Sequence, residues 1–158
     1  MEEKDAQITV VVVVHNAEIY VERCLNSLIN QDSQQFCVIL VDDGSSDHSQ
    51  EICRTAVGRM GKIARLIELS HGGVAKARNY GLAQVETPYV LFLDSDDWLD
   101  RNTISSMIEL VNAHQPELAV FGFYYEVADG THHLLRSHVQ RELLTRESIS
   151  RQFVSLWN

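Results

Sequence analysis

Seven of the ten aspartates of this chain lie in two short stretches. The first acidic stretch runs from 42 to 47 and the second from 94 to 100, and their aspartates are Asp42, Asp43, Asp47, Asp94, Asp96, Asp97 and Asp100. Like charges this close repel and raise each other's pKa unless something positive lies between them. A hard divalent ion supplies that charge, and oxygen ligands on a loop suit Mg²⁺ or Mn²⁺. The second acidic stretch therefore predicts a site for one of these ions.

Helix capping is the alternative explanation for individual aspartates. Asp is favoured at helix N-termini, where it accepts hydrogen bonds from free N–H groups and interacts well with the helix dipole. Capping accounts well for Asp47 and Asp100, but not for three carboxylates within residues 94–97.

A glycine pair and two basic residues lie between the acidic stretches, in segment 71–79. Gly72 and Gly73 precede a helical pattern, and Lys76 and Arg78 fall in its first turns. Helix N-termini and glycine N–H groups bind phosphate, and an arginine can hold it through two parallel hydrogen bonds. The segment predicts a phosphate site, and the alternative is a plain turn followed by two solvated basic residues.

Alternating strands and helices must position these residues. Four apolar runs predict buried strands, over residues 8–14, 37–41, 64–69 and 88–93. Apolar residues at helical spacing predict a helix over 17–30, and helices are also predicted from an N-cap candidate near Asp47 through about 59, over 74–84 and over 100–112. This alternation predicts an α/β fold, with a Rossmann-like, mostly parallel sheet flanked by helices. Each acidic stretch directly follows a strand, so both should face one crevice at the carboxyl edge of the sheet.

The last part of the chain is less regular. Residues 117–123 predict a fifth strand that runs on toward Glu126. Asp129-Gly130 is a hairpin turn signal before residues 132–135, and 145–157 have the spacing of a final helix.

Composition and charge narrow the classes of function. The chain has 158 residues, 45% of them hydrophobic, and we expect it to form one domain over 1–158. A net charge of −9, with no basic block, argues against nucleic acid as a partner. Cys24, Cys37 and Cys53 have no metal-binding spacing and predict reduced thiols of a cytoplasmic protein. No apolar run approaches the ~18 residues of a transmembrane segment.

Four segments, in this order along the chain, resemble the inverting family-2 glycosyltransferases. They are Val13-Val14-His15-Asn16-Ala17-Glu18, Val41-Asp42-Asp43-Gly44-Ser45-Ser46-Asp47, Gly72-Gly73-Val74 with Ala77-Arg78-Asn79, and Phe92-Leu93-Asp94-Ser95-Asp96-Asp97-Trp98. The resemblance implies the glycosyltransferase A-type fold, which binds a nucleotide-diphosphate sugar and a divalent metal. The positions it carries over as nucleotide-sugar-binding are Val13, His15, Asn16, Asp42, Asp43, His71, Arg78, Asp94 and Ser95.

The resemblance also implies roles for these residues. Asp42 or Asp43 would hydrogen-bond the nucleobase, usually uracil, and Arg78 would lie near the diphosphate or the sugar. Asp96 would bind Mn²⁺ or Mg²⁺ directly. Asp94 would hold ribose or sugar hydroxyls, and it is the second candidate metal ligand.

The chain departs from the family pattern in two places. The family commonly has Pro-x-Tyr-Asn after its first strand, where this chain has Val13-Val14-His15-Asn16. Histidine keeps a planar ring that can stack near the base, while the loss of proline leaves the shape of the loop open. His71 stands where the family commonly has Asn.

The resemblance implies transfer of a sugar, with inversion, to a hydroxyl of a glycan or lipid-linked acceptor. The expected donor is a UDP-sugar, and the expected process is the synthesis of cell-surface polysaccharide or glycoconjugate. Inversion needs a general base. The family supplies it well after its Asp-x-Asp motif, which the resemblance places at Asp94-Ser95-Asp96. Glu126, Asp129 and Glu142 match no motif, so no base is assigned, and we expect the acceptor-binding part to lie outside this chain. The expected location is the cytoplasm, with the inner face of the membrane as an alternative for the whole protein.

Three other functions fit parts of the pattern. A receiver domain and a haloacid-dehalogenase-type phosphatase also have acidic pockets on such sheets, but their acidic residues follow other strands than the second and fourth. The remaining alternative is a catalytically inactive, transferase-like domain that binds a nucleotide or a partner protein. Turnover by a longer protein would distinguish that domain from an enzyme.

Overall fold

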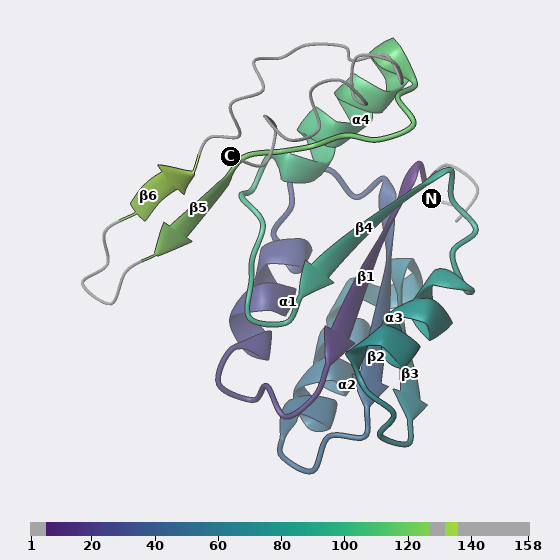
Figure 1. The fold of residues 1–158 in the computed structure, drawn as a ribbon, viewed down its shortest axis with the longest axis vertical. Coiled ribbons are helices and arrows are strands. Elements are labelled where there is room, and N and C mark those ends of the chain that lie inside the picture. The colour runs from purple at the N-terminus through teal and green to yellow at the C-terminus, as the bar shows by residue number, and fades with distance from the viewer. Residues whose placement is uncertain (1–5, 127–131, 136–158) are drawn as a thin grey trace. The chain divides into compact units, whose positions relative to one another are not determined.

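Four parallel strands, in the order β3-β2-β1-β4, form the central sheet of the structure (Figure 1). The computed structural model describes residues 6–126 and 132–135, and the chain divides into two units, Met1–Gln115 and Pro116–Asn158. The strands of the first unit are β1 Ile8–Val14, β2 Phe36–Asp43, β3 Ala64–Leu69 and β4 Tyr89–Asp94. Its helices are α1 Val21–Ile29, α2 Ser49–Met60, the short 3₁₀ helix η2 Gly61–Ile63, α3 Val74–Leu82 and α4 Thr103–His114. The predicted α/β architecture with a parallel sheet is confirmed.

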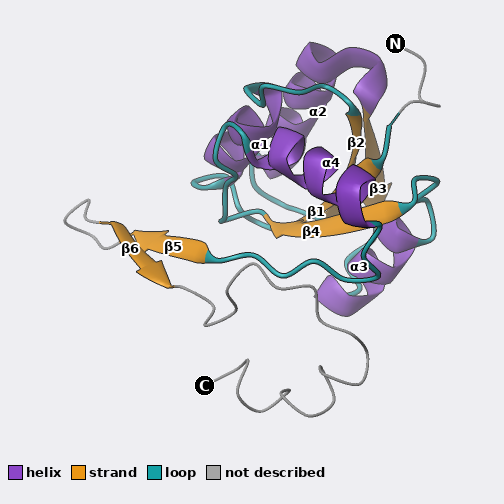
Figure 2. Ribbon diagram, turned by 90° about the horizontal axis from the view of Figure 1, so that it is seen from above, coloured by secondary structure: helices purple, strands orange, loops and turns teal. Residues whose placement is uncertain are grey.

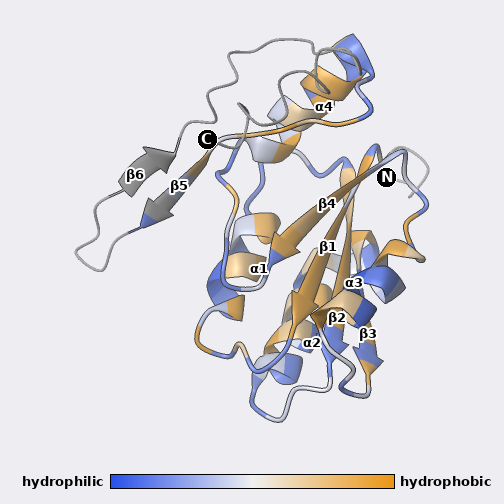
Figure 3. Cartoon of the chain, viewed as in Figure 1, coloured by the Kyte–Doolittle hydropathy of each residue, from blue (hydrophilic) through white to orange (hydrophobic). Residues whose placement is uncertain are grey.

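Helices cover both faces of this sheet, as Figure 2 shows: α1, α2 and α4 lie on one face and α3 on the other. The larger core lies under α1, α2 and α4, where Leu25, Leu40 and Ile104 are fully buried. Strand β1 is buried along its whole length, which explains its unbroken run of apolar and β-branched residues (Figure 3).

Helix α3 lies close to the sheet because a glycine faces the strands. A Cβ atom at Gly81 would lie 2.6 Å from Cγ1 of Val11 and 3.1 Å from Cγ2 of Val41. The missing side chain permits this approach. Arg78, one turn earlier on the same helix, is thereby held near the sheet.

Successive residues at the end of β2 point to opposite faces of the sheet. Leu40 packs in the core under α2, and Val41 packs in the smaller cluster beside α3. The alternation of a strand continues into the next two residues, so Asp42 faces α2 and Asp43 faces the start of α3.

Two helices begin later than the sequence predicts. Helix α1 begins at Val21 rather than at 17, because the chain first passes through a loop in which Asn16 has a left-handed φ of 49°. Helix α4 begins at Thr103 rather than at Asp100.

The second unit contains a hairpin of two antiparallel strands, β5 Phe123–Glu126 and β6 His132–Leu135. The predicted hairpin is present, but the fifth strand begins at Phe123 rather than at 117. Residues 116–122 pair with no other strand among the residues that the structure describes, and Leu118 is 70% exposed, so the apolar sequence alone did not make a strand there. The turn at Asp129-Gly130 and the helix predicted over 145–157 lie outside the described residues.

Within the described part of the chain, none of the helices combines the length and the apolar composition that crossing a bilayer requires.

Candidate functional site

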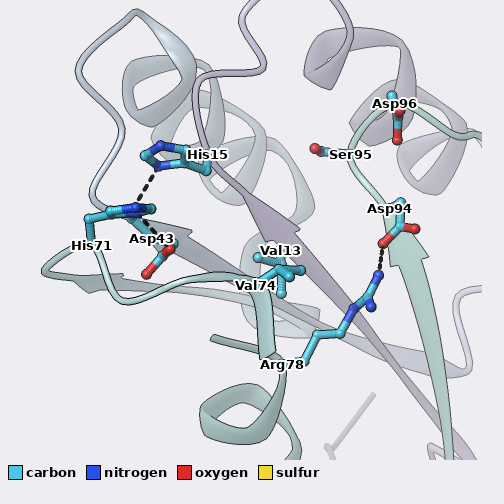
Figure 4. Close-up of a pocket in the computed structure, with 9 residues that line it drawn as sticks. All are labelled: Val13, His15, Asp43, His71, Val74, Arg78, Asp94, Ser95 and Asp96. Atoms are coloured by element: carbon cyan, nitrogen blue, oxygen red, sulfur yellow. Dashed lines mark hydrogen bonds and ion pairs between the residues drawn. The ribbon is translucent and has the colours of Figure 1, made fainter. Parts of the chain in front are cut away.

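A pocket of about 310 Å³ opens at the carboxyl ends of β1, β2 and β4 (Figure 4). The residues that line it are Val13, His15, Asp43, His71, Val74, Arg78, Asp94, Ser95 and Asp96. Eight of the ten residues expected to bind nucleotide sugar or metal are therefore brought together in one crevice, and the other two, Asn16 and Asp42, do not line it. Figure 4 shows two ends, with His15, His71 and Asp43 at one, Arg78 and the acidic loop at the other, and Val13 and Val74 between them.

Two stacked histidines form the first end of the pocket. The ring centroids of His15 and His71 are 4.2 Å apart, with an angle of 22° between the ring planes. The Nδ1 atom of His15 lies 2.8 Å from the backbone oxygen of Asp43. Both residues are exposed and line the pocket, so this end offers a flat aromatic surface of the stacked pair to a planar ligand.

Hydrogen bonds fix the tautomer of His15. The backbone N–H of Ser46 donates to Oδ1 of Asn16 over 2.8 Å, so the amide nitrogen of Asn16 faces Nε2 of His15, at 3.2 Å. That nitrogen is a donor, and Nε2 must therefore accept. The proton of the neutral ring is then on Nδ1, which donates it to the Asp43 carbonyl. Asn16 thus positions a pocket residue without lining the pocket itself.

The Asp43 carboxylate joins β2 to the start of α3. Its side chain is 2% exposed, and its two oxygens accept hydrogen bonds of 2.8 Å from the N–H groups of Gly72 and Gly73. Burial by itself would raise the pKa of Asp43, but these two hydrogen bonds and the nearby His71, 2.9 Å away, outweigh it and lower the pKa. The positive φ of Gly73, 92°, is the local backbone conformation that allows this approach.

The ligand atoms of His15, Asp43 and His71 lie within 4.8 Å of one another, close enough to hold a metal ion. The bonding just described favours a hydrogen-bonded cluster instead, because Nδ1 of His15 carries a proton and the Asp43 oxygens already accept backbone N–H groups.

Asp42 lies outside the pocket. It is fully buried, and its Oδ2 accepts hydrogen bonds from the N–H of Ser45 and the side chain of Gln50, at 3.3 and 3.2 Å. Its Oδ1 has no hydrogen-bond partner among the residues that the structure describes. Of the two aspartates considered for the nucleobase, only Asp43 lines the crevice.

The second end of the pocket is formed by the acidic loop and an arginine. Arg78 reaches from α3 and pairs with Asp94, and the two side chains are 40% and 52% exposed. Partial desolvation, followed by the negative charges of Asp96 and Asp94, raises the pKa of Asp97. The smaller contribution, from Asp96 and Asp94, is the like-charge effect expected for the second acidic stretch.

The donors at this end suit a hard cation. Asp94 and Asp96 offer only oxygen atoms, which Mg²⁺ and Mn²⁺ prefer. Among the described residues no three carboxylates of this loop converge on one point. Mg²⁺ in such sites is held by one or two carboxylates together with substrate phosphates, so the residues fit an ion that binds along with a phosphorylated ligand.

The capping predictions had different outcomes. Asp47 does serve the start of α2, because its Oδ1 accepts a 3.0 Å hydrogen bond from the N–H of Ser49. Asp100 does not cap α4: the N–H of Ile104 is bonded instead to Oε1 of Gln31, at 3.0 Å, a residue 73 positions earlier. A cap from such a distance has no local sequence signal.

Val74 and Gln31 are the residues that the sequence-based assignment missed. Val74 lines the pocket, and its position as the first residue of a helix that opens toward the crevice was a usable signal. Lys76 and Trp98, in contrast, do not line the pocket, and Trp98 stacks against Arg23 of α1 with 3.4 Å between the guanidinium carbon and the ring centroid.

Comparison with known proteins gives relatives in sequence and in structure. Glycosyltransferase GlyA of Streptococcus pneumoniae is 37% identical over 76% of this chain, and a teichoic acid poly(glycerol phosphate) polymerase of Staphylococcus epidermidis is 41% identical over 67%. The crystal structure of Staphylococcus aureus TarS 1–349 with UDP matches 69% of this chain, with 32% identity and a TM-score of 0.65.

The chain spans only part of these proteins: 17% of GlyA, 15% of the polymerase and 33% of the TarS chain. The family model described as glycosyl transferase family 2 matches residues 9–156. The resemblance noted in the four sequence segments is confirmed, and the chain belongs to glycosyl transferase family 2.

Proposed function

We propose that the pocket binds a nucleotide-diphosphate sugar, with UDP as the nucleotide, and that the whole protein transfers the sugar to an acceptor hydroxyl with inversion. The observation that carries this proposal is the division of the pocket into two chemically different ends (Figure 4). The flat surface of His15 and His71 suits a nucleobase. The end that contains Arg78 and the acidic loop suits a diphosphate with its cation.

The charges of the pocket support a role for a divalent ion. Its lining carries three carboxylates, Asp43, Asp94 and Asp96, and one arginine, Arg78, which already pairs with Asp94. A diphosphate entering such a pocket alone would be repelled. Asp96, with Asp94, would hold Mn²⁺ or Mg²⁺ at this end, and the ion would neutralise charge on the leaving diphosphate.

The residues of this chain then have separate tasks. His15 and Asp43 orient the base, and Val13 and Val74 form the apolar wall between the two ends. Arg78 can leave Asp94 and donate hydrogen bonds to the diphosphate. The acceptor oxygen attacks the anomeric carbon, the bond from that carbon to the diphosphate oxygen breaks, and the acceptor proton passes to a general base that we place in the acceptor-binding part of the whole protein.

The names of relatives indicate the class of acceptor. Two of them are a teichoic acid poly(glycerol phosphate) polymerase and a poly(ribitol-phosphate) β-N-acetylglucosaminyltransferase, and TarS has also been crystallised with UDP-GlcNAc. We therefore propose a cell-surface polymer, or its lipid-linked precursor, as acceptor, and a cytoplasmic location for the reaction.

The proposal is tested by calorimetric titration of the chain with UDP, once with Mn²⁺ and once with EDTA. The expected result is binding that is at least tenfold tighter with Mn²⁺, a factor that corresponds to about 1.4 kcal/mol. In Asp96→Asn this gain should disappear, because the direct ligand loses its charge. The matched control is Asp100→Asn, an exposed acidic residue of the same loop that does not line the pocket and should keep the gain.

Two outcomes contradict the proposal. An Asp96→Asn variant that keeps the full Mn²⁺ gain would overturn the metal assignment. A wild-type chain that binds UDP in neither condition would favour a domain that has lost nucleotide binding.

A further inference from the structure

Helix α1 contacts the second acidic stretch from the side away from the pocket. It lies beside the carboxyl end of β4 (Figure 1), and Cys24 donates a 3.6 Å hydrogen bond from Sγ to the backbone oxygen of Asp94. The hydroxyl of Ser27 accepts a 3.1 Å hydrogen bond from the N–H of Leu99. Residues at this spacing share one face of a helix, so α1 presents a polar stripe to the loop.

Gln31 completes this stripe just after the helix. It is 6% exposed, and both its amide nitrogen and its amide oxygen form hydrogen bonds. The Nε2 atom donates to the backbone oxygens of Ser27 and Asp100, at 3.0 and 2.8 Å. Its Oε1 accepts from the N–H of Ile104. One side chain thus joins the end of α1, the end of the acidic loop and the first turn of α4.

The loop needs such support because repulsion between its carboxylates opposes the conformation that keeps them close together. Asp94, Asp96 and Asp97 lie within four residues, and repulsion between them favours a more open loop. The bonds from α1 reach main-chain atoms and do not use the carboxylates of Asp94 and Asp96, which line the pocket. A loop held in this way keeps its carboxylates together before any cation binds, which lowers the cost of binding one.

From these contacts we infer that Gln31 and Ser27 are positioning residues of the cation end of the pocket. They touch neither nucleotide nor metal, and they act by holding the main chain at Leu99, Asp100 and Ile104, where the loop that begins at Asp94 ends. The inference rests on the proposed function, since it concerns the cation that would join UDP to Asp96 and Asp94.

Loss of these contacts should affect only the cation end of the pocket, because the end that contains His15 and His71 is built by other loops. Loss of the Gln31 amide should weaken UDP binding in Mn²⁺ and leave UDP binding in EDTA unchanged. The measured quantity is the ratio of the two affinities. Mutation of residues that orient metal ligands commonly costs 10–100-fold in metal affinity, so we expect Gln31→Met to lower the ratio about tenfold. Ser27→Ala, which loses one hydrogen bond, should lower it less.

A matched control separates positioning from general stability. Thr9 is 2% exposed and shares a 2.7 Å hydrogen bond with Thr87 at the opposite end of the sheet from the pocket. Thr9→Val should lower the melting temperature, as Gln31→Met does, but it should leave the affinity ratio at the wild-type value. All titrations are made well below the lowest melting temperature.

A Gln31→Met variant that keeps the wild-type ratio, with Ser27→Ala also unchanged, would overturn this inference while the proposed function stands. An equal fall in Thr9→Val and Gln31→Met would overturn it too, since the effect would then follow stability. Wild-type protein that binds UDP equally with Mn²⁺ and EDTA would leave no cation to position, and wild-type protein that binds no UDP would refute the proposed function itself.

Discussion

The two acidic stretches have similar compositions and both follow buried strands, yet their carboxylates are used differently. In the first stretch Asp43 and Asp47 accept backbone hydrogen bonds that join neighbouring loops, and the pKa of each is lowered despite the opposing effect of burial. In the second stretch the pKa of Asp97 is raised. Asp94 pairs with Arg78, and both side chains of that pair are substantially exposed.

The difference shows that the number of hydrogen-bond donors around a carboxylate, rather than the density of aspartates, separates a structural site from a candidate cation site. The first stretch already has its positive partial charges in backbone N–H groups. The second has few of them, so it is the stretch that a divalent cation would stabilise.

The largest expected effect tests this contrast through stability. Asp43→Ala leaves the N–H groups of Gly72 and Gly73 without their acceptor and should lower the free energy of unfolding by about 3 kcal/mol. Asp96→Ala, in the second stretch, should change it by no more than about 0.5 kcal/mol. Urea denaturation at pH 7 measures both. Equal losses in the two variants would mean that the contrast between the stretches is wrong.

A smaller effect is expected at Arg78. Arg78→Gln removes a charge-assisted contact to the proposed diphosphate and should weaken UDP binding in Mn²⁺ about tenfold. Stability should change by less than about 1 kcal/mol, because the ion pair with Asp94 is exposed. Lys76→Gln, on the same helix but outside the pocket, is the control for the lost charge. If both variants weaken UDP equally, the effect of Arg78 is one of net charge and not of position.

The smallest expected effect is at Asp97. Removing its charge should raise the free energy of unfolding, whereas removing the charge of Asp43 in the first stretch should lower it. Because the folded-state pKa is raised above the usual 3.8, the charged form of Asp97 costs stability at neutral pH. Asp97→Asn should therefore increase the free energy of unfolding slightly, by about 0.5 kcal/mol at pH 7. The gain should shrink as the pH falls through the raised pKa and vanish below 3.8, where wild-type Asp97 is protonated.

Thermal unfolding of wild type and Asp97→Asn across pH 3–7 measures this difference. Asp43 and Asp47 predict the reverse for the wild-type protein: their lowered pKa values give stability that is present above 3.8 and is lost as the pH falls further. An Asp97→Asn variant that is less stable at pH 7 would show that this carboxylate has a partner that stabilises its charge.

Much of this fold follows from local sequence patterns. The apolar run of β1 and the helical spacing of α1 are local signals. The rule that loops at the carboxyl ends of parallel strands share one edge indicated where the pocket lies. The fifth strand begins at Phe123 rather than at 117, because an apolar run becomes a strand only where another strand pairs with it. The hydrogen bond from Gln31 to Ile104 joins residues 73 positions apart, and no local pattern reports it.

The choice between Asp42 and Asp43 needed the structure for a different reason. Adjacent residues of a strand point to opposite faces, and the sequence does not state which face carries the crevice. The pairing of β2 with its neighbours and the position of α3 decide it. A similar limit applies to Asn16, whose side chain is oriented toward His15 by a hydrogen bond from Ser46, a residue of another loop.

The opposite orientation of Asp42 and Asp43 also limits how this sequence can change in length. Deleting one residue from β2 before Asp42 would exchange the two faces of the sheet for every following position. The carboxylate of Asp43 would then lie beneath α2, and that of Asp42 would point into the crevice. A change of two residues would preserve the faces but move the end of the strand past its partners in β1 and β3. Related sequences should therefore keep the length of β2 constant and vary in length at the loops that lie away from the crevice.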